Sequence, residues 1–299
     1  MTGSDNGDAA AAFRPESTAQ VFDLASRWVT TGGQRIHYHE AGSGTPVVLL
    51  HGSAVGASAA ANWWRTIPAL ADHARVLAPD LAGYGWTEAP DSGHYGLGAW
   101  SEQVGRFMDA VGVESAVLIG NSLGGRIGLQ VALDQPDRVL GLVTMGSPGL
   151  NHRRTEVVGR HVAPTVTREG IARVMADLAA DGYRIPDGLV EFRYRMASRP
   201  GAPERWAEVV KARDESVAQA GLTDEQVASV TVPALILHGM QDKVVTVADS
   251  LDTARALPNG DLMVFAHCGH WVQLEREDDF LAAVTRFLRR VAAPAVSHA

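Results

Sequence analysis

The chain has 299 residues, a formal net charge of −8 and one cysteine, Cys268, which excludes an intrachain disulfide and fits a reducing cytoplasm. With 46% hydrophobic and 20% charged residues, the composition is typical of a globular protein that can bury a sizeable core. Because no long basic run accompanies the acidic balance, the sequence lacks the electrostatic footprint of a nucleic-acid-binding protein.

The two ends of the sequence are predicted to be poorly ordered tails. Residues 1–20 carry small and acidic side chains where a secretory signal would have a basic region followed by an apolar core. The few residues after Arg290 form the second tail. No stretch approaches the roughly 18 consecutive apolar residues that span a bilayer. We therefore expect a cytoplasmic protein that binds neither a membrane nor nucleic acid.

Short apolar strands alternate with amphipathic helices from Val29 to Leu150. Continuous apolar strands of this kind are buried on both faces, which indicates a mostly parallel sheet covered by helices on each side. The expected elements are two strands around the Gly32–Gly33 turn, strands within 45–52 and from 74, a helix over 62–73, a helix from 97, a strand over 115–120, a helix after Ser122 that stops at Pro136, and a strand over 139–146.

The alternation stops near Leu150, and the next part of the chain contains helical patterns and no convincing strand. It resumes with a strand within 232–239, a helix over about 247–257, a strand within 261–270 and a final helix containing Phe280 and Phe287. We predict an α/β protein with a disordered tail over 1–20, a core in two parts over 21–150 and 223–299, and an inserted helical cap over 151–222.

The segment "GNSLGGRIG", residues 120–128, places Ser122 between glycines directly after an apolar strand. The pattern G-x-S-x-G is typical of a nucleophilic serine on a sharp turn from strand to helix, where a neighbouring Cβ would block the close approach of the two elements. Matches of five residues also occur by chance in glycine-rich turns. The serine therefore indicates catalysis only together with partners elsewhere in the chain.

A serine nucleophile needs a base to take its proton and an acid to orient that base. His270, in "VFAHCGHW", follows a predicted strand near the C-terminus, and Asp242, in "LILHGMQDKVV", follows an earlier one. The order Ser122, Asp242, His270 is the chain order of an α/β-hydrolase triad. In the alternative interpretation, Asp242 is a turn former and His270 a loop histidine. The other candidate acid position holds Ser147, which has no charge to orient an imidazole.

Hydrolysis through a serine also requires donors for the oxyanion that develops during attack. The backbone N–H groups of Ser53, which follows His51 and Gly52, and of Leu123, which follows the serine, are the expected pair. Leu123 is predicted to open a helix, where free N–H groups and the helix dipole favour negative charge.

Four segments, "LLHGS", "GNSLGG", "HGMQDKVV" and "CGHWVQLE", together resemble the meta-cleavage-product hydrolases, which cleave carbon–carbon bonds on the α/β-hydrolase fold. The resemblance implies that fold and the hydrolysis of a small molecule, a 2-hydroxy-6-oxo-2,4-dienoate, without a metal or organic cofactor. It also implies that Asn62, Asn121 and Trp271 line the polar end of the substrate site. The cap arginine that holds the substrate carboxylate in this family is best matched by Arg193.

Each of these residues also has a plain structural interpretation. Trp271 is then core packing, Asn62 a helix N-cap, and Arg193 part of a solvated helix face. In the loop that follows His51 and Gly52, Ala54 and Val55 occupy the positions where the family usually has Gly and Pro. This departure leaves open a carboxylesterase or lactonase with the same triad, or a non-catalytic ligand-binding member. The sequence also leaves homo-oligomerisation open.

Overall fold

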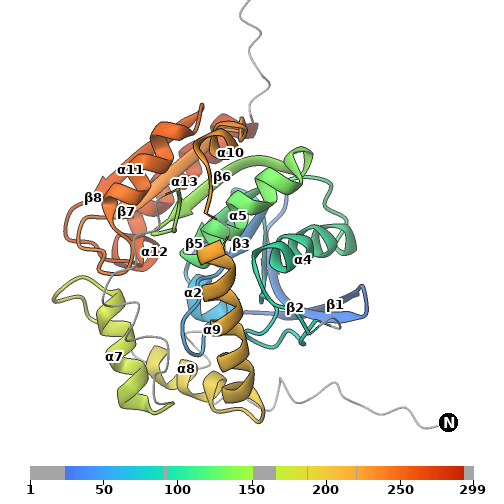
Figure 1. Ribbon diagram of the computed structural model, residues 1–299, viewed down its shortest axis with the longest axis vertical. Helices are drawn as coiled ribbons and strands as arrows, with labels where there is room; N and C mark the ends of the chain where they lie inside the picture. Colours follow the sequence, from blue (N-terminus) through green and yellow to red (C-terminus); the bar gives the residue numbers. More distant parts are fainter. Residues whose placement is uncertain (1–23, 91–92, 151–165, 187, 220, 293–299) are drawn as a thin grey trace, which may run out of the picture.

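A computed structural model describes residues 24–90, 93–150, 166–186, 188–219 and 221–292. The predicted N-terminal tail, the start of the predicted cap over 151–165 and the chain after Ala292 lie outside these residues. The described strands form one sheet in the order β1-β2-β4-β3-β5-β6-β7-β8 (Figure 1). Their bounds are β1 (Ser26–Thr31), β2 (Gln34–Ala41), β3 (Pro46–Leu50), β4 (Arg75–Pro79), β5 (Ala116–Asn121), β6 (Val139–Met145), β7 (Ala234–Gly239) and β8 (Gly260–Phe265).

The sheet is parallel except at one edge, as expected for an α/β protein. β1 and β2 form an antiparallel hairpin whose turn residues, Gly32 and Gly33, have φ of 56° and 79°. β2 also pairs antiparallel with β4, whereas β4, β3, β5, β6, β7 and β8 pair in parallel along the rest of the sheet. The predicted α/β-hydrolase fold, a mostly parallel sheet with flanking helices, is therefore confirmed.

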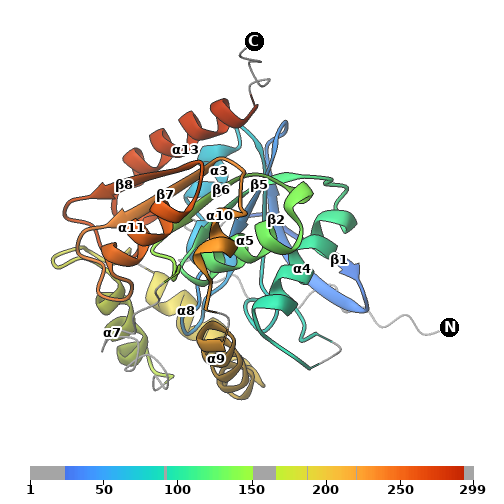
Figure 2. The same cartoon turned by 45° about the horizontal axis from the view of Figure 1, so that its top comes forward.

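Helices cover both faces of this sheet. In Figure 2, α3 and α13 lie on one face, and α4, α5, α10 and α11 lie on the other. The helices of the two faces are α2 (Ala59–Trp63), α3 (Thr66–Leu70), α4 (Leu97–Ala110), α5 (Leu123–Asp134), α10 (Asp224–Ala228), α11 (Val247–Ala256), α12 (Val272–Glu275) and α13 (Glu277–Ala292). The 3₁₀ helix η2 (Pro136–Arg138) follows α5 at the predicted proline stop.

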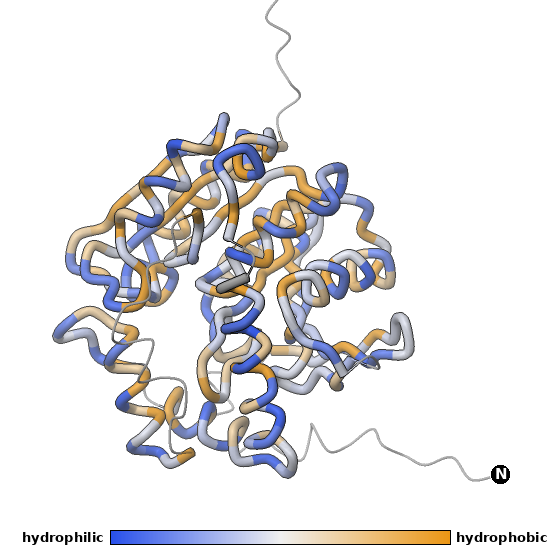
Figure 3. The backbone as a smooth tube through the Cα atoms, in the orientation of Figure 1, coloured by the Kyte–Doolittle hydropathy of each residue, from blue (hydrophilic) through white to orange (hydrophobic). Residues whose placement is uncertain are grey.

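The core has two layers because alternate residues of each strand point to opposite faces. Val48 and Leu50 of β3 belong to the layer with Trp100 of α4, while Val47 and Leu49 belong to the layer with Phe280 of α13. Hydrophobic segments accordingly follow the strands through the interior, and hydrophilic residues gather on outer turns and helix faces (Figure 3). This rigid core presents the loops after the parallel strands at one edge.

The predicted helix over 62–73 is wrong in its start and its continuity. α2 begins at Ala59, because the Ser58 side chain accepts a hydrogen bond from the Ala61 N–H at 3.1 Å and caps the helix. The helix then breaks at Trp64, and α3 begins at Thr66. Asn62 lies inside α2, so its interpretation as an N-cap is wrong as well.

The described part of the predicted cap, from residue 166 to 222, contains three helices: α7 (Arg168–Leu178), α8 (Leu189–Ala197) and α9 (Ala202–Gln219). We call α7, α8 and α9 the inserted helices. They lie together on one side of the sheet, at the bottom of both views (Figures 1 and 2). A third apolar cluster joins them to the core through residues such as Met175, Leu189, Ala61 and Trp271. None of the described residues between 166 and 222 forms a strand.

Candidate active site

Ser122 occupies the turn between β5 and α5. Its backbone has φ of 54° and ψ of −119°, in a region that a residue with a side chain adopts only under strain. The Ser122 N–H donates to the Met145 carbonyl at 2.8 Å, which ties the turn to the end of β6. This is the conformation expected for a serine that projects from a strand-to-helix turn.

The glycines around Ser122 leave room for the sharp turn. A Cβ on Gly120 would lie 2.3 Å from the Gly124 carbonyl carbon, and one on Gly124 would lie 2.0 Å from the Leu50 oxygen. Both distances are far inside van der Waals contact, and the obstacles are backbone atoms. A Cβ on Gly52 would lie 3.3 Å from the Ser122 Cβ, so the loop after β3 lies directly against the serine.

His270 and Asp242 form a buried hydrogen bond. His270 Nδ1 lies 2.7 Å from Asp242 Oδ2, and Asp242 Oδ1 accepts from the N–H groups of Val244 at 2.7 Å and Val245 at 3.0 Å. Burial alone would raise the pKa of Asp242, but the His270 charge and hydrogen bond, together with His238 and the Val245 N–H, hold this pKa below its ordinary value. Asp242 is therefore a carboxylate placed to orient His270.

A second histidine, His238, lies behind this pair and was not predicted as part of the site. Its Nε2 lies 3.0 Å from the Val245 carbonyl and 3.5 Å from Asp242 Oδ2, and its Nδ1 lies 2.6 Å from Ser250 Oγ. Burial lowers the pKa of His238. A neutral ring that donates from Nε2 and accepts at Nδ1 satisfies these partners. The spacing of four residues in "HGMQD" is the one sequence signal for this contact.

The ends of β5 and β6 bring the Ser122 turn close to His270 and Asp242. Asn121, directly before the serine, donates from Nδ2 to the His270 carbonyl at 3.2 Å. Gly146, directly after β6, has φ of 53°, and a Cβ there would lie 2.8 Å from His270 Nδ1 and 3.0 Å from Asp242 Oδ2. The Ser122 turn thus adjoins the His270–Asp242 pair at the carboxyl edge of the sheet.

Ser53 and Leu123, the expected oxyanion donors, lie on the loop after β3 and at the start of α5, which meet at Ser122. Leu123 is the first residue of α5, where the helix leaves N–H groups without an internal partner. Ser53 follows Gly52, and the Ser53 hydroxyl accepts a hydrogen bond from Arg213 Nη1 of α9 at 2.6 Å. His51 fixes the start of this loop, because its Nδ1 lies 2.8 Å from the Gly52 carbonyl and its Nε2 accepts from the Leu81 N–H at 3.0 Å.

Arg193 is a buried cation on α8, with only 2% of its surface exposed. Its guanidinium carbon lies 5.2 Å from the centroid of the Trp271 ring. Among the described residues, no partner accepts a hydrogen bond from Nε or Nη1 of Arg193. Burial lowers the pKa of Arg193 to about 10. The interpretation of Arg193 as part of a solvated face is therefore wrong.

Asn62, Asn121 and Trp271 are all buried, but their contacts differ. Asn62 lies on α2, which contacts α8, and within the described part of the chain its Nδ2 donates to no acceptor. Asn121 instead donates its amide hydrogens to two backbone carbonyls, those of His270 and Met145. Trp271 belongs to the apolar cluster between the core and the inserted helices, so it is a packing residue, which does not exclude contact with a substrate.

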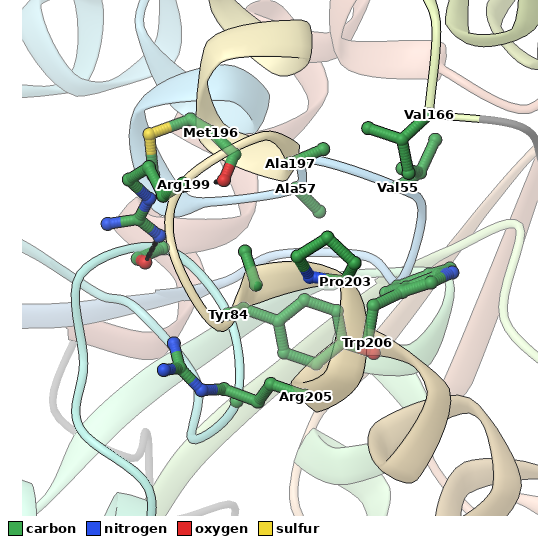
Figure 4. Close-up of a pocket in the computed structure, with 14 residues that line it drawn as sticks. Val55, Ala57, Tyr84, Val166, Met196, Ala197, Arg199, Pro203, Arg205 and Trp206 are labelled. Carbon is green, nitrogen blue, oxygen red and sulfur yellow. Dashed lines mark hydrogen bonds between the residues drawn. The ribbon is translucent and has the colours of Figure 1, made fainter.

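A pocket opens between the core and the inserted helices (Figure 4). Its walls come from the loops after β3 and β4 and from α8 and α9. The labelled side chains include Val55, Tyr84, Arg199, Arg205 and Trp206. The loop that carries Ser53 is therefore one wall of this space.

Cys268, beside the His270 loop, is buried, and burial raises the pKa of its thiol to about 12, as expected for a packing residue.

The described residues contain neither a membrane-spanning helix nor a metal-binding cluster. None of their helices has the length and apolar character needed to cross a membrane. No group of three or more His, Cys, Asp or Glu side chains in this part of the chain is arranged to hold a metal ion. His37 and His39, which share one face of β2, lie next to each other with ring centroids 4.9 Å apart.

A family model described as the alpha/beta hydrolase fold matches residues 45–277. The chain therefore belongs to the α/β-hydrolase family and is a hydrolase. Its relatives include a 2-hydroxy-6-oxo-2,4-heptadienoate hydrolase from Pseudomonas putida, 36% identical over 88% of this chain and 95% of the relative. A 2-hydroxymuconate semialdehyde hydrolase from a Pseudomonas species is 34% identical over 95% of this chain and 99% of the relative.

Solved structures that resemble this chain include an enzyme of the same group as these relatives. A meta-cleavage product hydrolase from Pseudomonas fluorescens has a TM-score of 0.83 and 32% identity, covering 90% of this chain and 98% of that chain. The predicted resemblance to this group is confirmed. A carboxylesterase from Bacillus subtilis has a TM-score of 0.78 at 21% identity, covering 91% of this chain and 95% of that chain, a likeness in fold alone. Fold by itself does not select the reaction.

Proposed function

We propose that this hydrolase cleaves the carbon–carbon bond next to the ketone of a 2-hydroxy-6-oxo-2,4-dienoate. The relatives named above support the substrate class, since the name of the Pseudomonas putida enzyme describes such a dienoate. The proposal assigns Ser122, His270 and Asp242 as the triad and the N–H groups of Ser53 and Leu123 as the oxyanion hole. The insertion 151–222 is then the cap over the site, and the enzyme is cytoplasmic.

One observation carries this choice of substrate: the buried Arg193 guanidinium. A buried cation without a counter-charge is costly, and the described residues supply Arg193 with no carboxylate. The carboxylate of a dienoate would fill that role, because a planar guanidinium can bond both oxygens. The free Nδ2 of Asn62, on the neighbouring helix α2, supplies a further donor. A neutral ester would leave Arg193 without a counter-charge.

The reaction then needs only groups of this chain and water. The dienol first becomes a ketone as a proton moves from the 2-hydroxyl group to C5, with His270 assisting the transfer. Ser122, or a water activated through the triad, adds to the C6 carbonyl, and the Ser53 and Leu123 N–H groups stabilise the oxyanion. The C5–C6 bond breaks, its electron pair enters a dienolate, and water supplies the hydroxyl of the acid that leaves.

The test of this proposal is a comparison of a dienoate with a neutral ester. Wild-type enzyme should remove the absorbance of ring-cleavage dienoates that differ in their 6-substituent. Arg193→Gln should lower kcat/KM for the dienoate by about 100-fold, since it leaves a buried carboxylate unpaired. The same change should scarcely affect a p-nitrophenyl ester. Arg193→Lys should recover part of the loss, because lysine restores the charge without the planar fork.

Arg195→Gln is the matched control on the same helix. Arg195 is paired with Glu191 on the outer side of α8, and its loss should leave both activities near the wild-type level. Equal losses on dienoate and ester in Arg193→Gln would mean that Arg193 supports α8 only. Turnover of esters alone would favour a carboxylesterase or lactonase, and saturable binding without turnover would favour a non-catalytic member.

A further inference from the structure

We propose that Arg213 of α9 is a positioning residue that holds the Ser53 loop in place for catalysis. The inference rests on the proposed function, because it takes the Ser53 N–H as an oxyanion donor. Its basis is the hydrogen bond from Arg213 Nη1 to Ser53 Oγ, which is 2.6 Å long and joins positions far apart in the chain. This contact links an inserted helix directly to the loop beside the nucleophile.

Arg213 is itself held rigidly. Asp214 Oδ1 lies 2.8 Å from Nε and 2.7 Å from Nη2 of Arg213, and the Arg213 side chain is 13% exposed. The guanidinium is therefore fixed on one side by Asp214 and presents its other terminal nitrogen to Ser53. A planar guanidinium held in this way loses little further freedom on bonding, which favours a fixed geometry over an adaptable one.

The Ser53 loop has few internal supports. Residues 52–57 form no strand or helix and contain no proline, so regular secondary structure does not fix their backbone. The Ala57 N–H donates to the Ala54 carbonyl at 2.9 Å, which closes one turn after Ser53. At the other end, the ring of Tyr84 contacts His51 edge-on and also contacts Trp206 of α9. The loop is thus stabilised mainly from outside, and α9 supplies part of that support.

The consequence is that Arg213 acts on catalysis through Ser53 and not through the substrate. An oxyanion donor must meet the developing charge at hydrogen-bond distance, and a displacement of about 1 Å can cost 100-fold in rate. Ser53 offers its side-chain oxygen to Arg213 and keeps its N–H for the oxyanion. Loss of either end of the Arg213–Ser53 bond should free the loop in the same way.

A double-mutant cycle tests this inference. Arg213→Gln and Ser53→Ala should each lower kcat by about 10- to 100-fold with little change in KM, although Ser53→Ala retains the N–H. The double variant should lose no more than either single variant, because both changes remove one bond. Arg213→Lys should recover part of the loss. Lys211→Gln, at an exposed position of the same helix, is the control and should leave kcat unchanged.

The cycle is measured on both a dienoate and p-nitrophenyl acetate. Additive losses, or a Ser53→Ala variant with wild-type kcat, would overturn the inference. If the dienoate is not cleaved while the ester is, the proposed substrate is wrong, yet the coupling on the ester still decides the role of Arg213. Thermal melting of each variant separates loop effects from loss of the fold, and Ser53→Ala retains a readout if Arg213→Gln does not fold.

Discussion

Asp242 remains ionised inside the protein because its oxygens are fully engaged. Two backbone N–H groups, from Val244 and Val245, bond one oxygen, and His270 bonds the other. A carboxylate held in this way can fix one tautomer of the imidazole and stabilise the imidazolium that forms during catalysis. The proposed role of the residue therefore depends on charge as well as on shape.

Asp242→Asn should leave the fold intact and lower kcat severely. Asparagine is almost the same size, but it removes the charge beside His270 and can favour the wrong tautomer. The equivalent change in a serine protease lowers turnover by about four orders of magnitude. Steady-state kinetics of Asp242→Asn, with Ser122→Ala as the reference for an absent nucleophile, measures the effect. A near-normal kcat in Asp242→Asn would move the acid to another carboxylate.

The residues of this site differ in how far sequence could predict them. Asp242 and His270 follow consecutive parallel strands of the chain, so topology alone brings them to one edge, and their order identified them. His238 has only its spacing of four residues from Asp242 as a signal, and Arg213 has none. The contact of Arg213 with Ser53 depends on how α9 crosses the core, which follows from side-chain packing and not from any local pattern.

At the scale of elements, the turn from β5 into α5 requires glycine for two separate reasons. Gly124 allows α5 to approach β3, while Gly120 allows the first turn of α5 to close over β5. The sequence pattern predicted this turn and the strands around it. It failed at α2 and α3, because the Ser58 cap starts α2 before Asn62 and the break at Trp64 separates two short helices that a continuous apolar pattern joins.

Gly124→Ala should destabilise the protein by about 3 kcal/mol or more, since the new methyl group would overlap the Leu50 carbonyl. Gly98→Ala is the matched control: it lies in helix α4, where a Cβ meets open space. That change should stabilise the protein by about 0.5–1 kcal/mol. Urea unfolding of the two variants compares them directly. Similar free energies of unfolding for both would contradict this account of the turn.

On the scale of the whole molecule, one buried carboxylate, that of Asp80, connects three separate segments of the chain. Asp80, at the end of β4, accepts from His37 Nδ1 at 2.8 Å, from the Ala59 N–H at 2.7 Å and from the Trp86 N–H at 2.8 Å. Burial alone would raise the pKa of Asp80, but His37, His51 and the Trp86 N–H hold it below its ordinary value. The β2 strand, α2 and the loop after β4 therefore share one anion.

Asp80→Asn should lower the free energy of unfolding by about 3 kcal/mol at pH 7, because it breaks a buried pair. A carboxyl whose pKa is lowered by folding contributes its stability above its ordinary pKa and loses it as the pH falls. The difference in the free energy of unfolding between wild type and Asp80→Asn should thus be largest at pH 7 and should decrease below about pH 4. Denaturant titrations at several pH values measure it. For the exposed Asp72→Asn control, we expect a small difference that does not vary in this way.

The direct pairing of β6 with β7 also determines how this protein can change over evolutionary time. Met145 pairs with Leu237 although the whole insertion lies between their strands. The entropy of closing such a long loop grows only with the logarithm of its length, so halving the segment would change the closure free energy by about 0.6 kcal/mol. The sheet therefore tolerates insertions of very different size at this point. Descendants of this chain can therefore change the segment between β6 and β7 while the paired strands stay folded.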